Sequence, residues 1–176
     1  MASIHTVTCR IIGLTSLVLM SLPIIASGQP KRPTKVKSPD GAIFVVIKDV
    51  GKDTSESLLT VSRADGTKLC SHDFSSPDGL QGYGAERAMW SRDGKFLAVK
   101  MSSSGGHSPM FAPIIIWNRK TNRLYTLKNF TGDTKFSLSA TDLLSADTWP
   151  DLKEKRVHLR DLKASELKEL ACDHPR

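Results

Sequence analysis

The sequence lacks three features that would identify its chemistry. Its three cysteines and five histidines among 176 residues show no zinc-ligand spacing, which argues against a structural zinc site. It has no Gly-x-Ser-x-Gly sequence of the kind that exposes a hydrolase nucleophile. Its longest mainly apolar stretch, Ile11–Ile25, has about 15 residues, fewer than the roughly 20 of a membrane-spanning helix. We therefore expect no metal, no cofactor, no stable membrane span and no enzymatic activity.

The first 28 residues have the order of a secretory signal peptide. Residues 1–10 carry one cation and no acid, the apolar stretch follows, and Ala26-Ser27-Gly28 supplies the small residues of a cleavage site. We expect cleavage after Ala26 or Gly28 and a periplasmic or secreted mature protein. A retained membrane anchor is the alternative. Residues 29–37, rich in proline and lysine, are expected to form a flexible lead-in.

The chain is moderately basic. Of its 25 lysines and arginines only Arg10 lies in the signal, and 18 acids oppose the rest, which leaves a mature net charge of about +6. The cations are scattered, acids interleave with them as in Asp151–Arg156, and no basic stripe with aromatics appears. This pattern predicts a solvated basic surface and no nucleic-acid partner. Attraction to an anionic envelope polymer is the alternative.

Two cysteines, Cys70 and Cys172, remain after removal of the signal. In an oxidising compartment such a pair is a candidate disulfide. The bond would tie the C-terminal segment to the middle of the domain. Two buried thiols are the alternative, because the sequence does not place the two Cα atoms within bonding range.

Two segments share one order of elements. Each opens with a Ser-x-Asp-Gly turn, at Ser38–Gly41 and at Ser91–Gly94, because the glycine tolerates positive φ. A strand, a loop, a second strand, a tight turn and a third strand follow. This order indicates an internal duplication within a single β-rich domain, residues 38–176. The repeat units cover about 38–90 and 91–144, and the expected strands lie at 42–47, 58–63, 67–70, 95–101, 114–117 and 123–127.

The tail of the sequence has a different pattern. Thr141–Leu144 is expected to form one helical turn, and Arg156–Arg160 alternates like a half-exposed strand. Ser165 is a candidate cap for a short helix through Glu166–Ala171, with Leu167, Leu170 and Ala171 on one face. The predicted fold is all-β, an antiparallel β-sandwich or propeller-like sheets from two repeats, with a short C-terminal helix.

The turn sequences resemble a known repeat. Ser38-Pro39-Asp40-Gly41 and the stretch Trp90-Ser91-Arg92-Asp93-Gly94-Lys95-Phe96-Leu97-Ala98 are similar to the repeat of Tol-type periplasmic β-propellers. The resemblance covers about residues 38–130 and implies blade-like sheets. A propeller needs at least about four blades to close, and only two units are visible. We therefore favour sheets packed face to face in one chain, with association of chains, such as a homodimer, as the alternative.

The loop Ser102–Phe111 is the candidate binding site. Its glycines let the backbone approach a partner, its serines and His107 offer hydrogen bonds, and Met110 and Phe111 offer apolar contact. An ordinary inter-strand loop, with Met110 and Phe111 folded onto the core, is the alternative. The candidate binding residues are Ser103, Ser104, Gly105, Gly106, His107 and Ser108.

The sequence Ser103-Ser104-Gly105-Gly106-His107 between two strands also resembles a loop of bacterial periplasmic lysozyme inhibitors. In that family a Ser-Gly-rich loop with a following tyrosine enters the lysozyme cleft. Here His107 stands in place of the aromatic hydroxyl. The resemblance implies an antiparallel β-sandwich and a lysozyme partner.

Two other groups of residues are candidates for contact. Gly79–Gly84 is glycine-rich and is expected to be a mobile connector, with Tyr83, Glu86 and Arg87 in a contact rim as the alternative. Trp90, Trp117 and Trp149 are expected to pack in the core or at its edge, and exposed rings would instead stack on sugars.

These observations predict an exported, non-enzymatic protein that contacts another protein or a cell-envelope polymer through the loop Ser102–Phe111. Inhibition of a cell-wall hydrolase such as lysozyme is one specific version. A propeller-like accessory module of an envelope complex is an alternative, and a secreted hydrolase is a second alternative.

Overall fold

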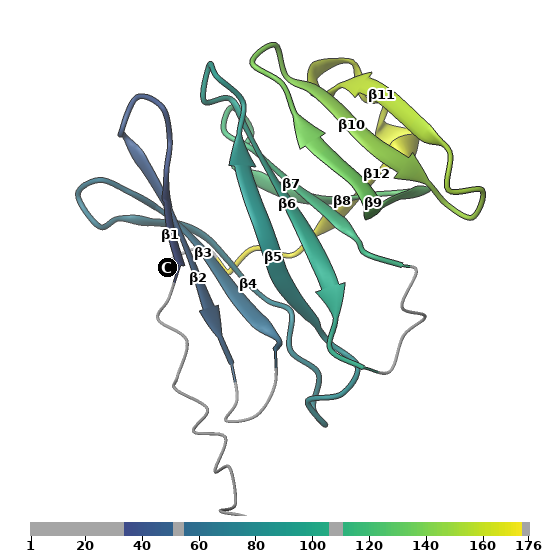
Figure 1. Cartoon of the computed structure of the whole chain (residues 1–176). Coiled ribbons are helices and arrows are strands. Elements are labelled where there is room, and N and C mark those ends of the chain that lie inside the picture. The colour runs from purple at the N-terminus through teal and green to yellow at the C-terminus, as the bar shows by residue number, and fades with distance from the viewer. Residues whose placement is uncertain (1–33, 51–54, 106–110, 174–176) are drawn as a thin grey trace, which may run out of the picture. The chain divides into compact units, whose positions relative to one another are not determined.

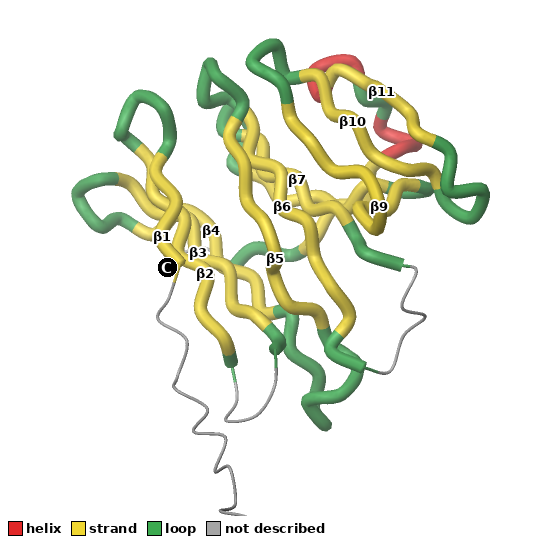
Figure 2. The backbone as a smooth tube through the Cα atoms, viewed as in Figure 1, coloured by secondary structure: helices red, strands yellow, loops and turns green. Residues whose placement is uncertain are grey.

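The computed structural model describes residues 34–50, 55–105 and 111–173, which form three antiparallel sheets (Figure 1). Within these ranges helix is confined to two short 3-10 turns, η1 (Leu159–Asp161) and η2 (Ala164–Glu166), drawn in red in Figure 2. The prediction of an all-β antiparallel fold is confirmed. The expected signal peptide, residues 1–28, lies outside the described residues.

The three sheets follow one another along the chain, with one exception. The first sheet contains, in spatial order, β1 (Thr34–Lys37), β2 (Ile43–Asp49), β3 (Ser57–Arg63) and β4 (Lys68–Asp73). The central sheet has the order β12 (Leu167–Leu170), β8 (Arg123–Leu127), β7 (Ile114–Asn118), β6 (Phe96–Ser103) and β5 (Tyr83–Trp90). The third sheet has the order β11 (Glu154–His158), β10 (Leu143–Thr148) and β9 (Phe130–Leu138). The exception is β12, which completes the central sheet after the third sheet has formed.

The central sheet is buried on both faces. Because side chains alternate along a strand, Leu97 and Ile115 pack in the cluster that contains the first sheet, whereas Ala98 and Ile116 pack in the cluster that contains the third. Each such fully buried isoleucine contributes about 1.5–3 kcal/mol to folding. The two cores explain why β6 and β7 have almost uninterrupted apolar sequences, as strands buried on both faces do.

The turns that open the two predicted repeat units have the same geometry. The Ser38 hydroxyl donates to Asp40 Oδ1 at 2.6 Å and accepts from the Ile43 amide at 2.9 Å. The Ser91 hydroxyl does the same with Asp93 Oδ1 at 2.8 Å and the Phe96 amide at 3.0 Å. Both glycines take positive φ, 73° at position 41 and 67° at position 94. Each turn fixes the start of an inner strand, β2 or β6.

The expected lead-in is shorter than predicted. Its last four residues, Thr34–Lys37, form β1, which pairs with β2 from Thr34 opposite Ile47 to Lys37 opposite Phe44. Lys35 Nζ lies 4.0 Å from the centre of the Phe44 ring. Backbone pairing therefore holds this segment against the first sheet, although its sequence has no strand periodicity.

The predicted C-terminal helix is wrong. Only the 3-10 turn η2 forms near Ser165, and Leu167–Leu170 is β12, paired with β8. A helix would place Leu167 and Leu170 on one face. In the strand they project from opposite faces, so that Leu167 packs in the cluster of the third sheet and Leu170 in that of the first. Burial in two cores explains the strand.

The third sheet also corrects one prediction and confirms another. Thr141–Leu144 does not form a helical turn: Asp142 has φ 60° in a tight turn, and β10 begins at Leu143. The predicted strand at Arg156–Arg160 is present as β11, two residues earlier. The two predicted repeat units would form two sheets. Instead, β9, β10 and β11 form a third sheet, which covers the far face of the central sheet.

The predicted disulfide between Cys70 and Cys172 is present, with the two Cα atoms 5.1 Å apart. It joins β4 to the segment that follows β12. Two hydrogen bonds accompany it, from the Asp173 amide to the Ser71 carbonyl at 2.9 Å and between His72 Nδ1 and the Ala171 carbonyl at 2.6 Å. The end of the described chain is thus fixed to the edge of the first sheet.

Candidate binding groove

The predicted binding loop leaves the central sheet at the end of β6. Of its candidate residues, Ser103, Ser104 and Gly105 are described, and Gly106, His107 and Ser108 lie outside the described residues. The Ser104 hydroxyl donates to Glu56 Oε1 at 2.8 Å and to the Gly82 carbonyl at 3.0 Å. The first role of Ser104 is therefore to anchor the base of the loop.

Glu56 is the centre of this anchor. Its side chain is almost completely buried, at 1 % exposure, and accepts hydrogen bonds from the Gly82 amide at 2.6 Å, the Ser76 amide at 2.9 Å and the Ser76 hydroxyl at 2.7 Å, besides that of Ser104. Burial disfavours the charged carboxylate, but the hydrogen bonds from Ser76, Ser104 and Gly82 outweigh it and hold the pKa of Glu56 below its ordinary value. Three segments far apart in the sequence are thus held together by one carboxylate.

The segment 76–82 is fixed by its own turn as well. The Ser76 hydroxyl donates to Asp78 Oδ1 at 2.8 Å, the Leu80 amide donates to the same oxygen at 3.0 Å, and Gly79 has φ 70°. This is the Ser-Pro-Asp-Gly turn of Ser38–Gly41 again, and the expectation of a mobile connector is not supported by this bonding. The turn holds Leu80 outward with 61 % of its surface exposed.

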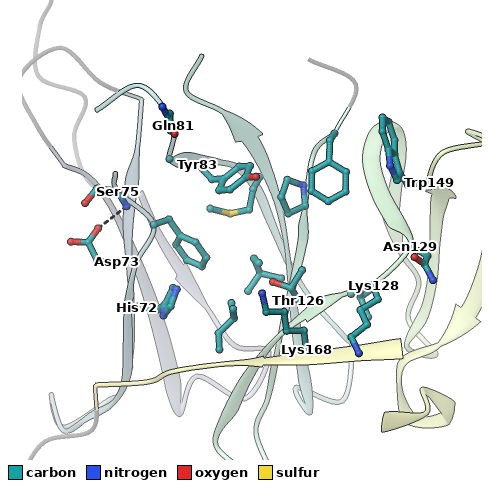
Figure 3. Close-up of a pocket in the computed structure, with 18 residues that line it drawn as sticks. His72, Asp73, Ser75, Gln81, Tyr83, Thr126, Lys128, Asn129, Trp149 and Lys168 are labelled. Atoms are coloured by element: carbon teal, nitrogen blue, oxygen red, sulfur yellow. Dashed lines mark hydrogen bonds between the residues drawn. The ribbon is translucent and has the colours of Figure 1, made fainter. Parts of the chain in front are cut away.

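A cavity of about 730 Å³ lies beside this turn (Figure 3). Leu170 of β12 is partly exposed on its apolar floor, and the buried side chains of Met101 of β6 and Ile115 of β7 lie beneath. Its aromatic walls come from separate segments: Figure 3 shows Tyr83 toward one side and Trp149 toward the other. The lining consists of His72, Asp73, Phe74, Ser75, Gln81, Gly82, Tyr83, Met101, Phe111, Pro113, Ile115, Thr126, Leu127, Lys128, Asn129, Trp149, Lys168 and Leu170. We call this cavity the groove.

The predicted loop and the groove are continuous. Met101 precedes the loop, Phe111 is its last residue, and both line the groove. The Phe111 ring packs edge to face on the Trp149 ring, with centroids 5.6 Å apart. Phe111 therefore contributes to a wall of the groove. It lies neither in the core nor at an isolated loop tip. Trp149 belongs to the same wall, while Trp117 is buried in the core.

The rim of the groove is polar and unevenly charged. Lys128 and Lys168 are exposed, and neither has an ion-pair partner among the residues that the structure describes. Asp73 lies on the opposite side and accepts a hydrogen bond from the Ser75 amide at 2.9 Å. Burial raises the pKa of Tyr83, so its phenol is neutral at physiological pH. The groove thus combines an apolar interior with one cationic side.

One histidine is present in the lining of the groove. His72, the histidine of the lining, is engaged by the Ala171 carbonyl and packs on the Phe74 ring with centroids 4.5 Å apart. Across the described ranges, no three His, Cys, Asp or Glu side chains gather as metal ligands would. None of the described segments forms a helix with the length and apolar character that crossing a membrane requires.

Sequence reasoning identified part of this site. Of the predicted loop Ser102–Phe111, Phe111 lines the groove, whereas the candidate residues Ser103, Ser104 and Gly105 do not. Tyr83, considered only as an alternative contact residue, also lines it. Sequence reasoning missed Glu56, in a segment that looked like a polar loop, and Lys128 and Lys168. One sequence feature could have indicated the turn beside the groove: Ser76-Pro77-Asp78-Gly79 has the same sequence as Ser38-Pro39-Asp40-Gly41.

No protein-family model, curated protein or solved structure matches this chain. The resemblances to Tol-type propellers and to periplasmic lysozyme inhibitors stay predictions.

Proposed function

We propose that this chain is a non-enzymatic binding protein that holds a macromolecular partner in the groove and against the adjoining loop Ser102–Phe111. The observation that supports this proposal is the groove itself, about 730 Å³ with an apolar floor and aromatic walls. Ligand sites are typically concave and mainly apolar, with a few polar groups that fix orientation.

The segments around the groove are pre-organised. The Glu56 carboxylate joins the turn at Ser76, the backbone at Gly82 and the loop base at Ser104. Binding to such a surface costs less conformational entropy than binding to a mobile loop. This arrangement favours recognition of a partner over a purely structural role for the connector.

The disulfide and the signal-like leader support export of the chain. A Cys70–Cys172 bond persists in oxidising environments, which together with the signal-like residues 1–28 supports a periplasmic or secreted location. Mass spectrometry of the protein from its native host tests this. A mature chain that starts near residue 29 agrees with export, and an intact Met1 in a cytosolic fraction contradicts it.

Site-specific crosslinking tests the binding function. A photoreactive residue replaces Leu80 beside the groove, and a matched one replaces Ser165, which is exposed on η2. We expect one protein adduct of defined mass from position 80 and none from position 165. The purified partner must then bind the wild-type chain and lose about tenfold or more affinity for Trp149→Ala, as expected for a contacting aromatic residue. An adduct pattern that is the same at both positions contradicts the proposal.

The lysozyme version needs a separate measurement. The purified protein is added to lysozymes of several types, and lysis of cell walls is followed. Inhibition that is lost on deletion of residues 106–110 supports a plug-like loop. Unchanged lysis with every lysozyme removes this version and leaves the broader binding function standing.

A propeller-like accessory module is a second candidate. The shared geometry of the turns at Ser38 and Ser91, and the face-to-face stack of sheets, favour it. Crosslinking separates the two candidates, because an envelope module predicts adducts from the outer faces of the stack, as at position 46 of β2, in place of position 80.

A further inference from the structure

We infer that the groove binds an extended polypeptide segment that places a large apolar side chain on its floor and carboxylates beside Lys128 and Lys168. This inference rests on the proposed binding function and names the chemistry of its partner.

The two lysines lie close together at the groove. In the pairing of β8 with β12, Lys168 stands opposite Thr126. Lys128 directly follows β8, in a turn, and its amide donates to the Glu166 carbonyl at 2.8 Å, which continues the pairing of the two segments. Lys128 and Lys168 both line the groove. Figure 3 shows the two side chains next to each other below the groove.

Nearby cations form ion pairs with carboxylates, whereas Lys128 and Lys168 form none with the described residues. On the same strand pair Arg123 binds Glu169 at 2.9 Å, and Lys155 of β11 binds Glu166 at 3.3 Å. Lys128 and Lys168 have no such partner in the described ranges. Two like charges at the lining of one groove repel each other, so an anionic group placed near both relieves this repulsion. The ligand therefore carries a negative charge at this side.

The interior of the groove demands an apolar group. Apolar surface is presented to the groove by four partly exposed side chains, those of Tyr83, Phe111, Trp149 and Leu170, whereas Met101 and Ile115 are buried beneath them. A volume of about 730 Å³ accommodates one or two large side chains of a ligand. An apolar group next to a carboxylate is a combination that a polypeptide supplies within a few residues.

Two features favour a polypeptide over the other polymers of a cell surface. The rings of Phe111 and Trp149 meet edge to face at an angle of 73°, so they form no common flat platform on which sugar rings would stack. Leu80, at 61 % exposure, is the one large apolar side chain exposed among the described residues. A single such side chain suits contact with a protein and is too little apolar surface for insertion into a lipid layer.

Leu80 extends the site beyond the groove. A Cβ built on Gly105 would lie 3.4 Å from the Leu80 carbonyl, so the turn that presents Leu80 lies against the base of the predicted loop. A segment bound in the groove reaches Leu80 next to Gln81 and Tyr83 of the lining.

Two peptides test this inference. Both are acetylated, amidated octapeptides that alternate charged residues with leucine and phenylalanine; one carries glutamate and the other carries lysine. The full-length, ¹⁵N-labelled protein is titrated with each, and the indole N–H signal of Trp149, assigned with Trp149→Phe, is the readout. We expect the acidic peptide to shift this signal in a salt-sensitive manner and to bind at least about tenfold more tightly than the basic one.

Charge reversal provides the matched control. Lys128→Glu/Lys168→Glu is expected to invert the preference, whereas Lys48→Glu/Lys120→Glu, with the same change in net charge at exposed positions outside the groove lining, is expected to leave it unchanged. Equal binding of both peptides, no shift with either, or an inversion by the control variant overturns the inference. A partner that crosslinks at position 80 while both peptides fail leaves the proposed function intact; failure of both experiments removes both.

Discussion

The Glu56 carboxylate and the Ser104 hydroxyl are 2.8 Å apart although 48 residues separate them in the sequence. The same carboxylate accepts the Gly82 amide. The base of the candidate binding loop is therefore positioned by the residue that directly precedes β3 of the first sheet.

Glu56→Gln is expected to loosen the turn at Ser76 and the loop base together. The glutamine side chain has one acceptor oxygen in place of two, and its N–H₂ group would face hydrogen-bond donors. Buried backbone amides that donate to Glu56 therefore lose their acceptor. Hydrogen exchange measured by NMR is expected to accelerate about tenfold or more at the Ser76 and Gly82 amides, both bound to Glu56. Glu169→Gln, at an exposed ion pair, is the control and should leave both rates unchanged. Equal effects of the two substitutions would show that the carboxylate of Glu56 does not hold the turn.

Stability is expected to fall in acid because native carboxyl groups have lowered pKa values. The hydrogen bond from Lys95 is the main cause that lowers the pKa of Asp93 from 3.8 to about 2, and the pKa of Glu56 is also lowered. A group with a lowered folded-state pKa contributes stability that is fully present above its unfolded value and is lost as the pH falls toward the folded one. Urea midpoints should therefore be nearly constant from about pH 7 to about pH 5 and fall from about pH 4 to about pH 2.

Asp93→Asn separates this contribution from general acid effects. The variant should be less stable than wild type at neutral pH and should lose less stability on acidification, because it lacks one carboxyl group that takes up a proton on unfolding. Parallel pH profiles of the two proteins would contradict the role of Asp93.

Loss of the disulfide is expected to destabilise the fold by about 2–4 kcal/mol. The bond spans 102 residues, and constraint of so long a loop in the unfolded chain reaches about 4.7 kcal/mol in the chain-entropy model. The measurement is urea unfolding of Cys70→Ser/Cys172→Ser against wild type, with and without reductant. Reductant should lower the midpoint of the wild type only. A reductant effect on the double variant would point to another cause.

Neighbouring isoleucines test the burial of both faces of the central sheet. Ile115→Ala and Ile116→Ala remove side chains that are each 2 % exposed but belong to different cores. Each should cost about 2–5 kcal/mol in denaturant unfolding. Leu80→Ala, at an exposed position, should change stability by less than about 0.5 kcal/mol. A small cost at only one isoleucine would mean that this face is not covered.

The local features of the fold could be predicted from the sequence. The turns at Ser38 and Ser91 depend on a serine, an aspartate and a glycine that act within six residues, and the strands they start are apolar and β-branched. Such signals are contained in a short window. The disulfide needed only a pair of cysteines and an expected oxidising compartment.

The features that were predicted wrongly or missed depend on residues that are far apart in the sequence. Glu166–Ala171 has a spacing that suits a helix, but the pairing of Leu167 with Leu127 and of Leu170 with Leu124 makes it a strand. Long-range pairing overrides local propensity in such segments. The groove also depends on residues far apart in the sequence, because Tyr83, Trp149 and Lys168 meet only after the sheets have assembled. No window of the sequence contains them together.

The late position of β12 has a consequence for biosynthesis. The strand belongs to the middle layer, yet its residues, 167–170, are made after all three strands of the outer layer built from β9, β10 and β11. Until residues 167–172 have been added, the edge of β8 lacks its partner strand and Cys70 lacks Cys172. An unpaired strand edge is a template for pairing with another chain, so a chain that ends before residue 167 is expected to associate more readily than the full-length protein.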